Sequence, residues 1–582
     1  MKRNNFITFL YAGVSLCVTL LACSEDKGNY DYSEENHILI SGISKYNALI
    51  SGADYLVMTP EIISSIDGEI EANNPNYEFA YQRKADNKWI DMCNEKDINI
   101  LADMGSGNHT CIFTVTDKRT KAKTIQSFNL DVKSVTSEGW MVLCNEGPEE
   151  KLRMDMLANV SVSRIFPVRN ALEIDKAVPE LKQATKIGYF RTKTNLGDDI
   201  MVFSKTGAYI VPTDDGGSST DGQLMPIKPM EEVVNNRFLA PTKEHLIDFV
   251  TIPVQPNPSI FNYSFGRKCG ALAVSEEGNV FAWFMLQGGG AFEFAVNTPV
   301  RGEDPEYRVA PHIGRSLNGP DTAPYYGAAL LYDIDNHRFI GWDGVGATTM
   351  GDKNGRTQIC TPLEDPENKK FSYKTGNMEL VTMLSTANDN QIYSIMKDGD
   401  KRHVYVVRIT LEGQFEQVAA YTDIQATHFK DATHFAASSQ YPIIYYAYKN
   451  KVYSYNVATK EEKEAVTLPE GEEVTLLKFN IYEDPFGVGS MLNMGSFLKS
   501  KDELTRQIYI ERTKELMVGS YNTAATDNNG GVLRFYKVGT RGLDLTLKQD
   551  KGQNSENGEM EDRIWEYKGF ARIVDVTYKE KR

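Results

Sequence analysis

The sequence predicts an all-β protein in which a small β-sandwich is followed by a β-propeller, with seven blades expected and eight as the alternative if the C-terminal hairpin stands alone. Two patterns support this fold class. Short segments that alternate apolar and polar residues recur along the chain, and from residue 139 onward a hairpin pattern returns about every 60 residues. The composition agrees, because 30 Tyr and 26 Phe among 582 residues favour strands.

The N-terminus has the organisation of an exported, lipid-anchored protein. Lys2 and Arg3 precede an uncharged, mostly apolar run over 6–21, which is too short for a comfortable membrane span. The run ends in Leu20-Leu21-Ala22 directly before Cys23, and this ending resembles the bacterial lipobox. The resemblance implies that residues 1–22 are a signal peptide and that Cys23 carries lipid such as palmitate. An ordinary signal followed by a chance cysteine is the alternative.

Residues 23–36 are expected to form a flexible tether, because they are polar, acidic and poor in β-branched residues. An acidic cluster directly after the lipidated cysteine resembles the surface-export signal of Bacteroidota lipoproteins. This implies an outer-membrane protein that faces the cell exterior, and a plain solvated linker is the alternative. The formal net charge of −16 argues against nucleic acid as a partner.

Residues 37–135 are predicted to form the sandwich, with about seven short strands. One strand begins at residues 37–40, and residues 77–81 alternate. In the segment 107–117 the alternation places Cys111, Phe113 and Val115 on one face. A further alternating strand covers residues 127–132.

The same segment carries a family resemblance. Gly107, the strand 111–117 that ends in Val-Thr-Asp, and the closing strand with Phe128, Leu130 and Val132 resemble the PKD or Ig-like lipoprotein domain, although His109 stands where that motif has an aromatic residue. The stretches 27–32 and 139–143 also resemble PKD-like family lipoproteins of Bacteroidota. The resemblance implies a PKD-like sandwich that precedes a propeller-like region.

Residues 139–582 are predicted to form the propeller. The centres of the repeated turns fall near residues 147, 206, 277, 336, 389, 449 and 513. The strands expected on either side of these turns are 140–144 with 151–154, 200–203 with 208–211, 271–274 with 280–284, 329–332 with 338–342, 383–385 with 391–395, 443–446 with 451–455, and 507–510 with 515–518. Antiparallel hairpins at an even spacing are typical of propeller blades, and a string of sandwiches is the alternative.

The end of the chain is expected to close the ring. A last strand beside the first blade would remove the exposed sheet edges. We also expect residues 532–537 to pair with 571–576 and residues 541–562 to form a loose loop.

No catalytic, cofactor or metal motif is found in the sequence. Signatures of zinc proteases, serine nucleophiles and phosphate-binding loops are missing. His428 and His434 are six residues apart, about 20 Å along a strand, which is too far for a shared metal. The acidic pairs at 198–199 and 214–215 and the segment 333–336 are interpreted as turn residues. Cys93 and Cys111 could form a disulfide, but free buried thiols are favoured.

Ligand contacts are expected on the long connections between strands, where aromatic residues and arginine lie among Gly and Pro. The alternative is that these side chains pack neighbouring blades together. The candidates are Phe261, Tyr263, Phe265, Arg267, Arg315, Tyr325, Tyr326, Tyr482 and Phe486.

The resemblance implies a non-enzymatic surface lipoprotein that serves an outer-membrane nutrient-uptake system. Its expected partners are a TonB-dependent transporter and the lid lipoprotein of that transporter, and its ligand is a glycan, a peptide or an iron chelate. Two alternatives remain open. The protein could be a propeller glycosidase or lyase, or it could be an adhesin or structural surface protein.

Overall fold

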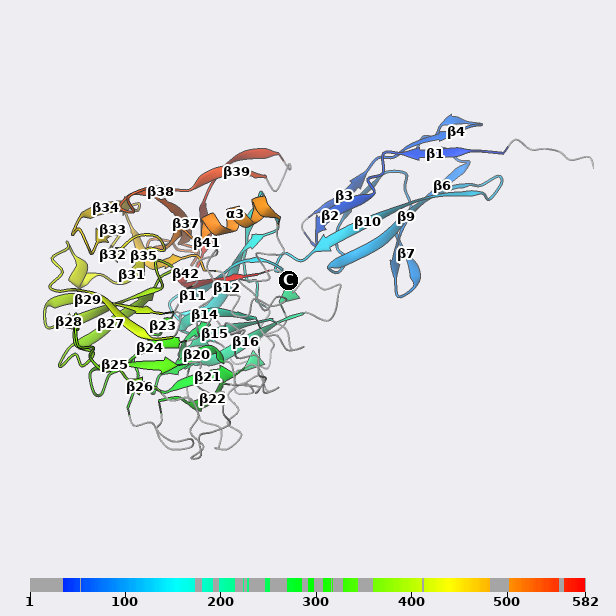
Figure 1. The fold of residues 1–582 in the computed structure, drawn as a ribbon. Coiled ribbons are helices and arrows are strands. Elements are labelled where there is room, and N and C mark those ends of the chain that lie inside the picture. Colours follow the sequence, from blue (N-terminus) through cyan, green and yellow to red (C-terminus); the bar gives the residue numbers. More distant parts are fainter. Residues whose placement is uncertain are drawn as a thin grey trace, which may run out of the picture. The chain divides into compact units, whose positions relative to one another are not determined.

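A computed structural model of the chain is shown in Figure 1. It describes residues 35–52, 54–172, 181–191, 198–214, 223–224, 228–229, 246–251, 269–284, 292–297, 307–315, 317, 328–343, 360–410, 413–481, 502–553 and 559–580. The chain divides into two compact units, one formed by residues 1–47, 55–100 and 109–130 and the other by residues 48–54, 101–108 and 131–582. Over the described residues, no helix is long and apolar enough to cross a membrane.

The N-terminal region folds as an all-β sandwich whose strands alternate as the sequence predicts. One layer contains a five-stranded sheet in the order β2-β10-β9-β6-β7. The other strands form the sheet β1-β4-β5 and the pair β3-β8. The strands are β1 (Ile38–Ser41), β2 (Tyr46–Ile50), β3 (Tyr55–Met58), β4 (Glu61–Ser64), β5 (Gly68–Glu69), β6 (Tyr77–Ala85), β7 (Lys88–Cys93), β8 (Ile98–Leu101), β9 (Gly107–Asp117) and β10 (Lys123–Lys133).

The core of the sandwich consists of the apolar faces of these strands. Cys111, Phe113 and Val115 of β9 are fully buried, so the predicted alternation is confirmed. The ring of Phe113 stacks on that of Tyr81 from β6, with 4.3 Å between the ring centroids. Cys93 and Cys111 are both free thiols, as the sequence favoured.

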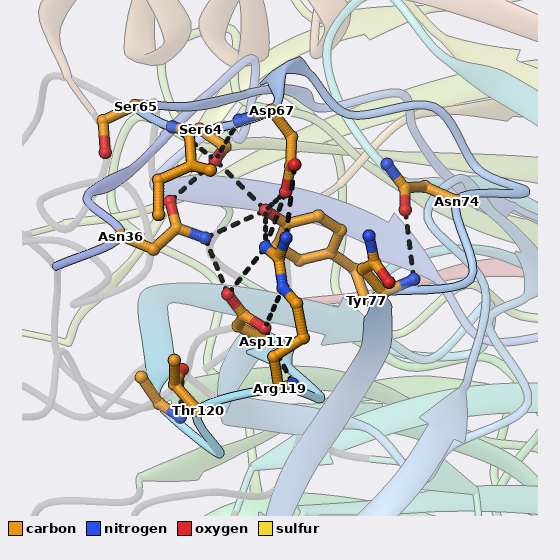
Figure 2. A network of polar contacts seen from close by, with 12 residues as sticks. Asn36, Ser64, Ser65, Asp67, Asn74, Tyr77, Asp117, Arg119 and Thr120 are labelled. Atoms are coloured by element: carbon orange, nitrogen blue, oxygen red, sulfur yellow. Dashed lines mark hydrogen bonds and ion pairs between the residues drawn. The ribbon is translucent and has the colours of Figure 1, made fainter. Parts of the chain in front are cut away.

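One end of the sandwich is tied together by a polar network around Arg119 (Figure 2). The guanidinium donates to Asp117 at 2.9 Å and to Asp67 at 2.6 Å. Tyr77 donates to Asp67, and the amide of Asn36 donates to Asp117 at 2.8 Å. Hydrogen bonds from Arg119 hold the pKa of both carboxyl groups below the usual range. The network joins the start of the unit, a turn and the end of β9.

Over the described residues, seven successive antiparallel sheets of four or five strands make up the propeller. The first sheet has the order β13-β12-β11-β42, and each later sheet begins with the next strands in sequence. The first four sheets contain β11 (Gly139–Glu146), β12 (Lys151–Asn159), β13 (Ile165–Val168) and β42 (Arg572–Lys579); β14 (Ala184–Arg191), β15 (Asp198–Ser204), β16 (Gly207–Asp214), β17 (Gln223–Leu224) and β18 (Lys228–Pro229); β19 (Leu246–Thr251), β20 (Cys269–Ser275), β21 (Val280–Phe284) and β22 (Phe292–Ala295); and β23 (Gly314–Arg315), β24 (Ala328–Asp333), β25 (Arg338–Asp343) and β26 (Thr361–Pro362).

The remaining sheets follow the same plan. They contain β27 (Glu379–Ser385), β28 (Gln391–Asp398), β29 (Lys401–Ile409) and β30 (Phe415–Tyr421); β31 (His434–Ala437), β32 (Ile443–Tyr448), β33 (Lys451–Asn456) and β34 (Glu462–Thr467); and β35 (Glu472–Phe479), β36 (Glu515–Asn522), β37 (Gly531–Val538), β38 (Leu545–Leu547) and β41 (Glu566–Phe570). The predicted hairpins are found at six of the seven turns, from β11–β12 to β32–β33.

The seventh predicted hairpin is wrong in its first strand. Residues 507–510 lie within a helix, α3 (Glu503–Arg512). Asp502 caps this helix, because its side chain accepts a hydrogen bond from the backbone N–H of Thr505. The run Gln507-Ile508-Tyr509-Ile510 has too few residues for its apolar pattern to separate helix from strand.

The ring is closed by the last strand, as predicted. Strand β42 pairs antiparallel with β11, from Gly139 opposite Lys579 to Asn145 opposite Arg572. Aromatic rings pack at this joint, where the ring centroids of Trp140 and Tyr578 are 4.9 Å apart. The indole N–H of Trp140 also donates a hydrogen bond to Asn480 Oδ1 at 3.1 Å.

Two details of the C-terminal prediction are wrong. Residues 532–537 do not pair with 571–576, because β37 pairs with β36, β38 and β41 while β42 crosses to the first sheet. The expected loose loop over 541–562 contains β38 and the hairpin of β39 (Gln549–Gln553) and β40 (Met560–Ile564). A polar composition is compatible with an exposed hairpin as well as with a loop.

We expect the substitution Gly531→Ala to weaken the joint between β37 and the segment that leads into β42. A Cβ atom at Gly531 would lie 2.0 Å from the carbonyl oxygen of Ala571, so the backbone has to shift. Overpacking of this kind costs about 1–3 kcal/mol of unfolding free energy, which urea denaturation can measure. Gly105→Ala is the control, because no heavy atom lies within 4 Å of a Cβ there. Equal midpoints for the two variants would contradict this account of the joint.

We expect the sandwich to lose stability on acidification through Asp67 and Asp117. Their folded-state pKa values are lowered, so the stabilisation is present above the unfolded value of about 4 and is lost as pH falls below it. Amide hydrogen exchange in β4 and β9, corrected for the intrinsic effect of pH, measures this loss. Arg119→Met should flatten the pH dependence, whereas Lys118→Met, which removes only a 3.8 Å contact to Glu78, should not. An unchanged profile in the Arg119 variant would refute the assignment.

Candidate functional site: the inner strands of the propeller

The innermost strands of the sheets contact one another in a ring, and they carry charged side chains in otherwise apolar segments. In the first sheet this strand is β42, and in each later sheet it is the first strand in sequence. Strand β42 contacts β14 and β35, while β27 and β31 continue the ring. Four of the charged groups on these strands pair with one another across neighbouring strands, and a histidine two residues before β23 lies near one of the pairs. They are Lys186 on β14, Asp248 on β19, Lys478 on β35, Asp575 on β42 and His312. Asp575 is buried and the other four are half-buried.

Asp575 links three inner strands. Its Oδ1 atom accepts from Lys478 Nζ at 2.9 Å, and its Oδ2 atom accepts from the backbone N–H of Ile187 at 3.2 Å. The same lysine also donates to the carbonyl of Val576 at 2.7 Å. Burial disfavours the charge on Asp575, but Lys478 and Lys186 outweigh this effect and keep its pKa below the usual range. The carboxylate therefore stays ionised and bound.

Lys186 and Asp248 form a second pair between neighbouring inner strands. The distance from Nζ to Oδ1 is 3.2 Å. Asp248 raises the pKa of Lys186 above its usual range against the opposing effect of burial, so the amine stays protonated. Burial lowers the pKa of His312, with Asp248 opposing and Lys186 adding to the shift, so this imidazole is neutral at pH 7.

A belt of side-chain hydrogen bonds joins the other inner strands. The guanidinium of Arg315 donates to the carbonyl and hydroxyl of Thr251, both at 2.5 Å, and so bridges β23 and β19. The backbone N–H of Arg315 donates to Ser385 Oγ at 2.9 Å, which connects β27. Thr386 donates from its hydroxyl to the carbonyl of Ser438, after β31.

The structure places one of the predicted ligand contacts inside this belt. Arg315 is buried and binds Thr251, so its place is between blades, as the alternative interpretation expected. The other candidates lie outside the described residues, and so does the predicted lipid-attachment residue. They are Phe261, Tyr263, Phe265, Arg267, Tyr325, Tyr326, Tyr482, Phe486 and Cys23.

Sequence analysis missed the inner-strand groups, although a signal for them exists. A charged residue inside an apolar strand is costly unless it has a partner. Asp575 stands between Val574 and Val576, and Lys478 stands between Leu477 and Phe479. Each was therefore a candidate for a buried ion pair, but the partner could not be named from the pattern.

Asp198, Asp199 and Asp214, which the sequence interpretation placed in turns, lie in strands β15 and β16. The other polar candidates serve local structure. Asp333 accepts from the backbone N–H groups of Asp335 and Asn336 at 3.1 and 3.0 Å, so it caps its own turn as predicted. His428 stacks on Tyr448 with 4.1 Å between the ring centroids, and His434 shares a 2.9 Å hydrogen bond with a neighbouring hydroxyl. No group of three or more candidate metal ligands occurs in the part of the chain that the structure describes.

The chemistry of the inner ring favours binding over proton transfer. A general acid needs a carboxyl group with a raised pKa, and a nucleophilic lysine needs a lowered one. Asp575 and Lys186 are shifted in the opposite directions. The half-buried ammonium groups and the neutral His312 can instead bind acceptor oxygens of a ligand.

Comparison with known proteins identifies the N-terminal region. The PKD-like family matches residues 23–171, about a quarter of the chain, which includes the sandwich and the first hairpin after it. A search of curated proteins finds no match.

Several solved structures are similar at low identity. A quinonprotein alcohol dehydrogenase-like protein from Bacteroides thetaiotaomicron has 11% identity and a TM-score of 0.37, with 94% of this chain and 100% of that chain covered. A lectin from Agrocybe aegerita that recognises terminal N-acetylglucosamine has 11% identity and a TM-score of 0.37, with 76% and 96% covered. The surface component PorZ of the Porphyromonas gingivalis type-IX secretion system has 9% identity and a TM-score of 0.30, with 92% and 68% covered. These similarities concern the fold alone.

We expect Asp575→Ala to destabilise the propeller strongly. The change leaves Lys478 and the N–H of Ile187 without the carboxylate, and breaking a buried pair in this way costs about 3–5 kcal/mol. Urea denaturation gives the unfolding free energy. Glu379→Ala is the matched control, because it breaks an equally short pair with Lys397 at the surface and should change little. If both variants unfold at the same urea concentration, Asp575 does not hold the ring.

Proposed function

We propose that this protein is a non-enzymatic, outward-facing outer-membrane lipoprotein, which serves as an accessory, ligand-binding subunit of a TonB-dependent nutrient-uptake system. The observation that carries the proposal is the inner ring, in which Asp248 and Asp575 are each paired with a half-buried lysine and the half-buried His312 lies near the first of these pairs. Such an arrangement can hold a ligand with acceptor oxygens, such as a glycan, a peptide or an iron chelate.

The proposed location depends on the first residues of the chain. Cys23 follows Leu20-Leu21-Ala22 after an uncharged run, and the PKD-like match begins at the same residue. Acyl chains at Cys23 would hold the protein on a membrane surface, since each buried methylene contributes about 0.8 kcal/mol. The acidic residues Glu25 and Asp26 directly after it support export to the cell surface.

The absence of catalysis is proposed from the charges and not from missing motifs. A glycosidase needs one carboxyl group as the acid and another as nucleophile or base, on opposite sides of a sugar. The carboxylates of Asp248 and Asp575 each contact a lysine, and the lowered pKa of Asp575 keeps that carboxyl group from serving as a neutral acid. The ring residues are therefore assigned to holding the blades and to contacting the ligand.

We expect the protein to co-purify with a transporter. A tag after Arg582 allows recovery from detergent-solubilised native envelopes, and mass spectrometry identifies the companions. A TonB-dependent transporter in near-equal amount is the expected result, because an accessory subunit should be stoichiometric. The control is the Cys23→Ala variant, which should no longer be found in the membrane fraction and should no longer co-purify with the transporter. Recovery of the wild-type protein alone would rule out the accessory role.

A further inference from the structure

Exposed apolar side chains are concentrated on the sandwich. Ten of the thirteen large apolar residues that are exposed in the described part of the chain fall between residues 39 and 125, although the propeller is several times longer. They are Leu39, Tyr46, Tyr55, Val57, Ile63, Ile66, Trp89, Ile90, Leu101 and Ile125. Single exposed apolar residues are ordinary, but a group that shares one sheet face marks an interaction surface.

Four of these residues lie on the same side of one layer. From residue 55 to 64 exposed and buried positions alternate without a break, and β3 and β4 follow one another along one side of the unit (Figure 1). Tyr55, Val57 and Ile63 are therefore on the outer face, with exposed fractions of 58%, 59% and 50%. Leu39 of β1, 67% exposed, is directly opposite Ile63. We name these four residues the β1–β3–β4 face.

The core does not require this face to be apolar. Leu56, Met58 and Ile62 are the buried partners of the same strands and already supply the contacts to the interior. Among the outward positions from 55 to 63, Glu61 is the one charged residue, and Glu69 of β5 lies opposite Ile63. No lysine lies at these positions. Strand β1 also ends its sheet, because it pairs with β4 alone in the described residues. An apolar face beside an open edge invites contact unless something covers it.

The position of the face in the chain identifies what covers it. Leu39 follows Cys23 by 16 residues. A tether of that length with random-coil statistics would have a root-mean-square span of about 20–24 Å, so a lipid at Cys23 would hold β1 close to the bilayer. The tether also raises the local concentration of the face at the lipid surface. Tyrosine and aliphatic residues suit the boundary between headgroups and acyl chains.

We propose that the β1–β3–β4 face rests on the lipid surface to which the chain is anchored. This inference uses the lipid anchor of the proposed function. The contact is made by Leu39 and Ile63, with Tyr55 and Val57 beside them. It depends on apolar insertion and not on charge, because a chain with a net charge of −16 is not attracted to anionic lipid.

Photolabelling from the bilayer tests the proposal directly. The lipidated full chain is reconstituted into zwitterionic vesicles that contain a phospholipid with a photoactivatable acyl chain, and labelled peptides are located by mass spectrometry. We expect label on residues 38–41 and 55–64. The double variant Leu39→Glu, Ile63→Glu should reduce it about ten-fold, which corresponds to about 1.4 kcal/mol. Ile125→Glu is the matched control, because Ile125 is 55% exposed but lies on the other layer. This substitution should leave the labelling of the β1–β3–β4 face unchanged.

A second form of the protein separates this inference from the anchor. The chain from Ser24 onward, held on nickel-chelating vesicles by an N-terminal histidine tag, is labelled in the same way. If the native chain has no acyl mass at Cys23, the proposed anchor fails, and label on the face of the tagged chain still supports the lipid contact. Label spread equally over β10 and the face, or no label in either form, would overturn it. Protection of the face in the native envelope without label in pure vesicles would show a protein partner instead and would also overturn it.

Discussion

Closure of the ring is the constraint on which the rest of the second unit depends. A ring whose first and last sheets do not meet leaves open edges, and open edges carry unpaired N–H and C=O groups. Strand β42 removes this cost by completing the sheet that β11 begins. In doing so it comes to lie between β35 and β14, and Asp575 then reaches Lys478 on one side and the backbone of Ile187 on the other. The polar ring is thus a consequence of closure.

In both units a buried carboxylate accepts hydrogen bonds from donors on different segments of the chain. In the sandwich Asp117 accepts from Arg119 and Asn36, and in the propeller Asp575 accepts from Lys478 and Ile187. A buried carboxylate is expensive to desolvate, so it is tolerated only where its oxygen atoms have several partners. Each carboxylate therefore specifies which segments meet, more than it adds to stability. The same partners keep the pKa of each carboxyl group below its usual range.

The strands were predictable because their signal is local. Alternation with a period of two placed Cys111, Phe113 and Val115 in the core, and the hairpin at β24–β25 followed from an apolar strand, an Asp-Asn turn and a second strand. The errors arose where the local signal is short or ambiguous. The run at 507–510 is helical because Asp502 caps it, and the polar segment over 541–562 forms strands because β39 and β40 pair with each other.

The same distinction between local sequence signals and tertiary contacts applies to the candidate site. The sequence by itself determined the all-β class, the faces of most strands and the repetition that makes a ring, because these depend on neighbours two to about sixty residues apart. Only the tertiary structure decided that Lys186 meets Asp248, that Asp575 joins three strands and that Arg315 is buried against Thr251. The physical reason is that alternation states which side of a strand a residue occupies, whereas the partner comes from another blade, whose position depends on closing the whole ring.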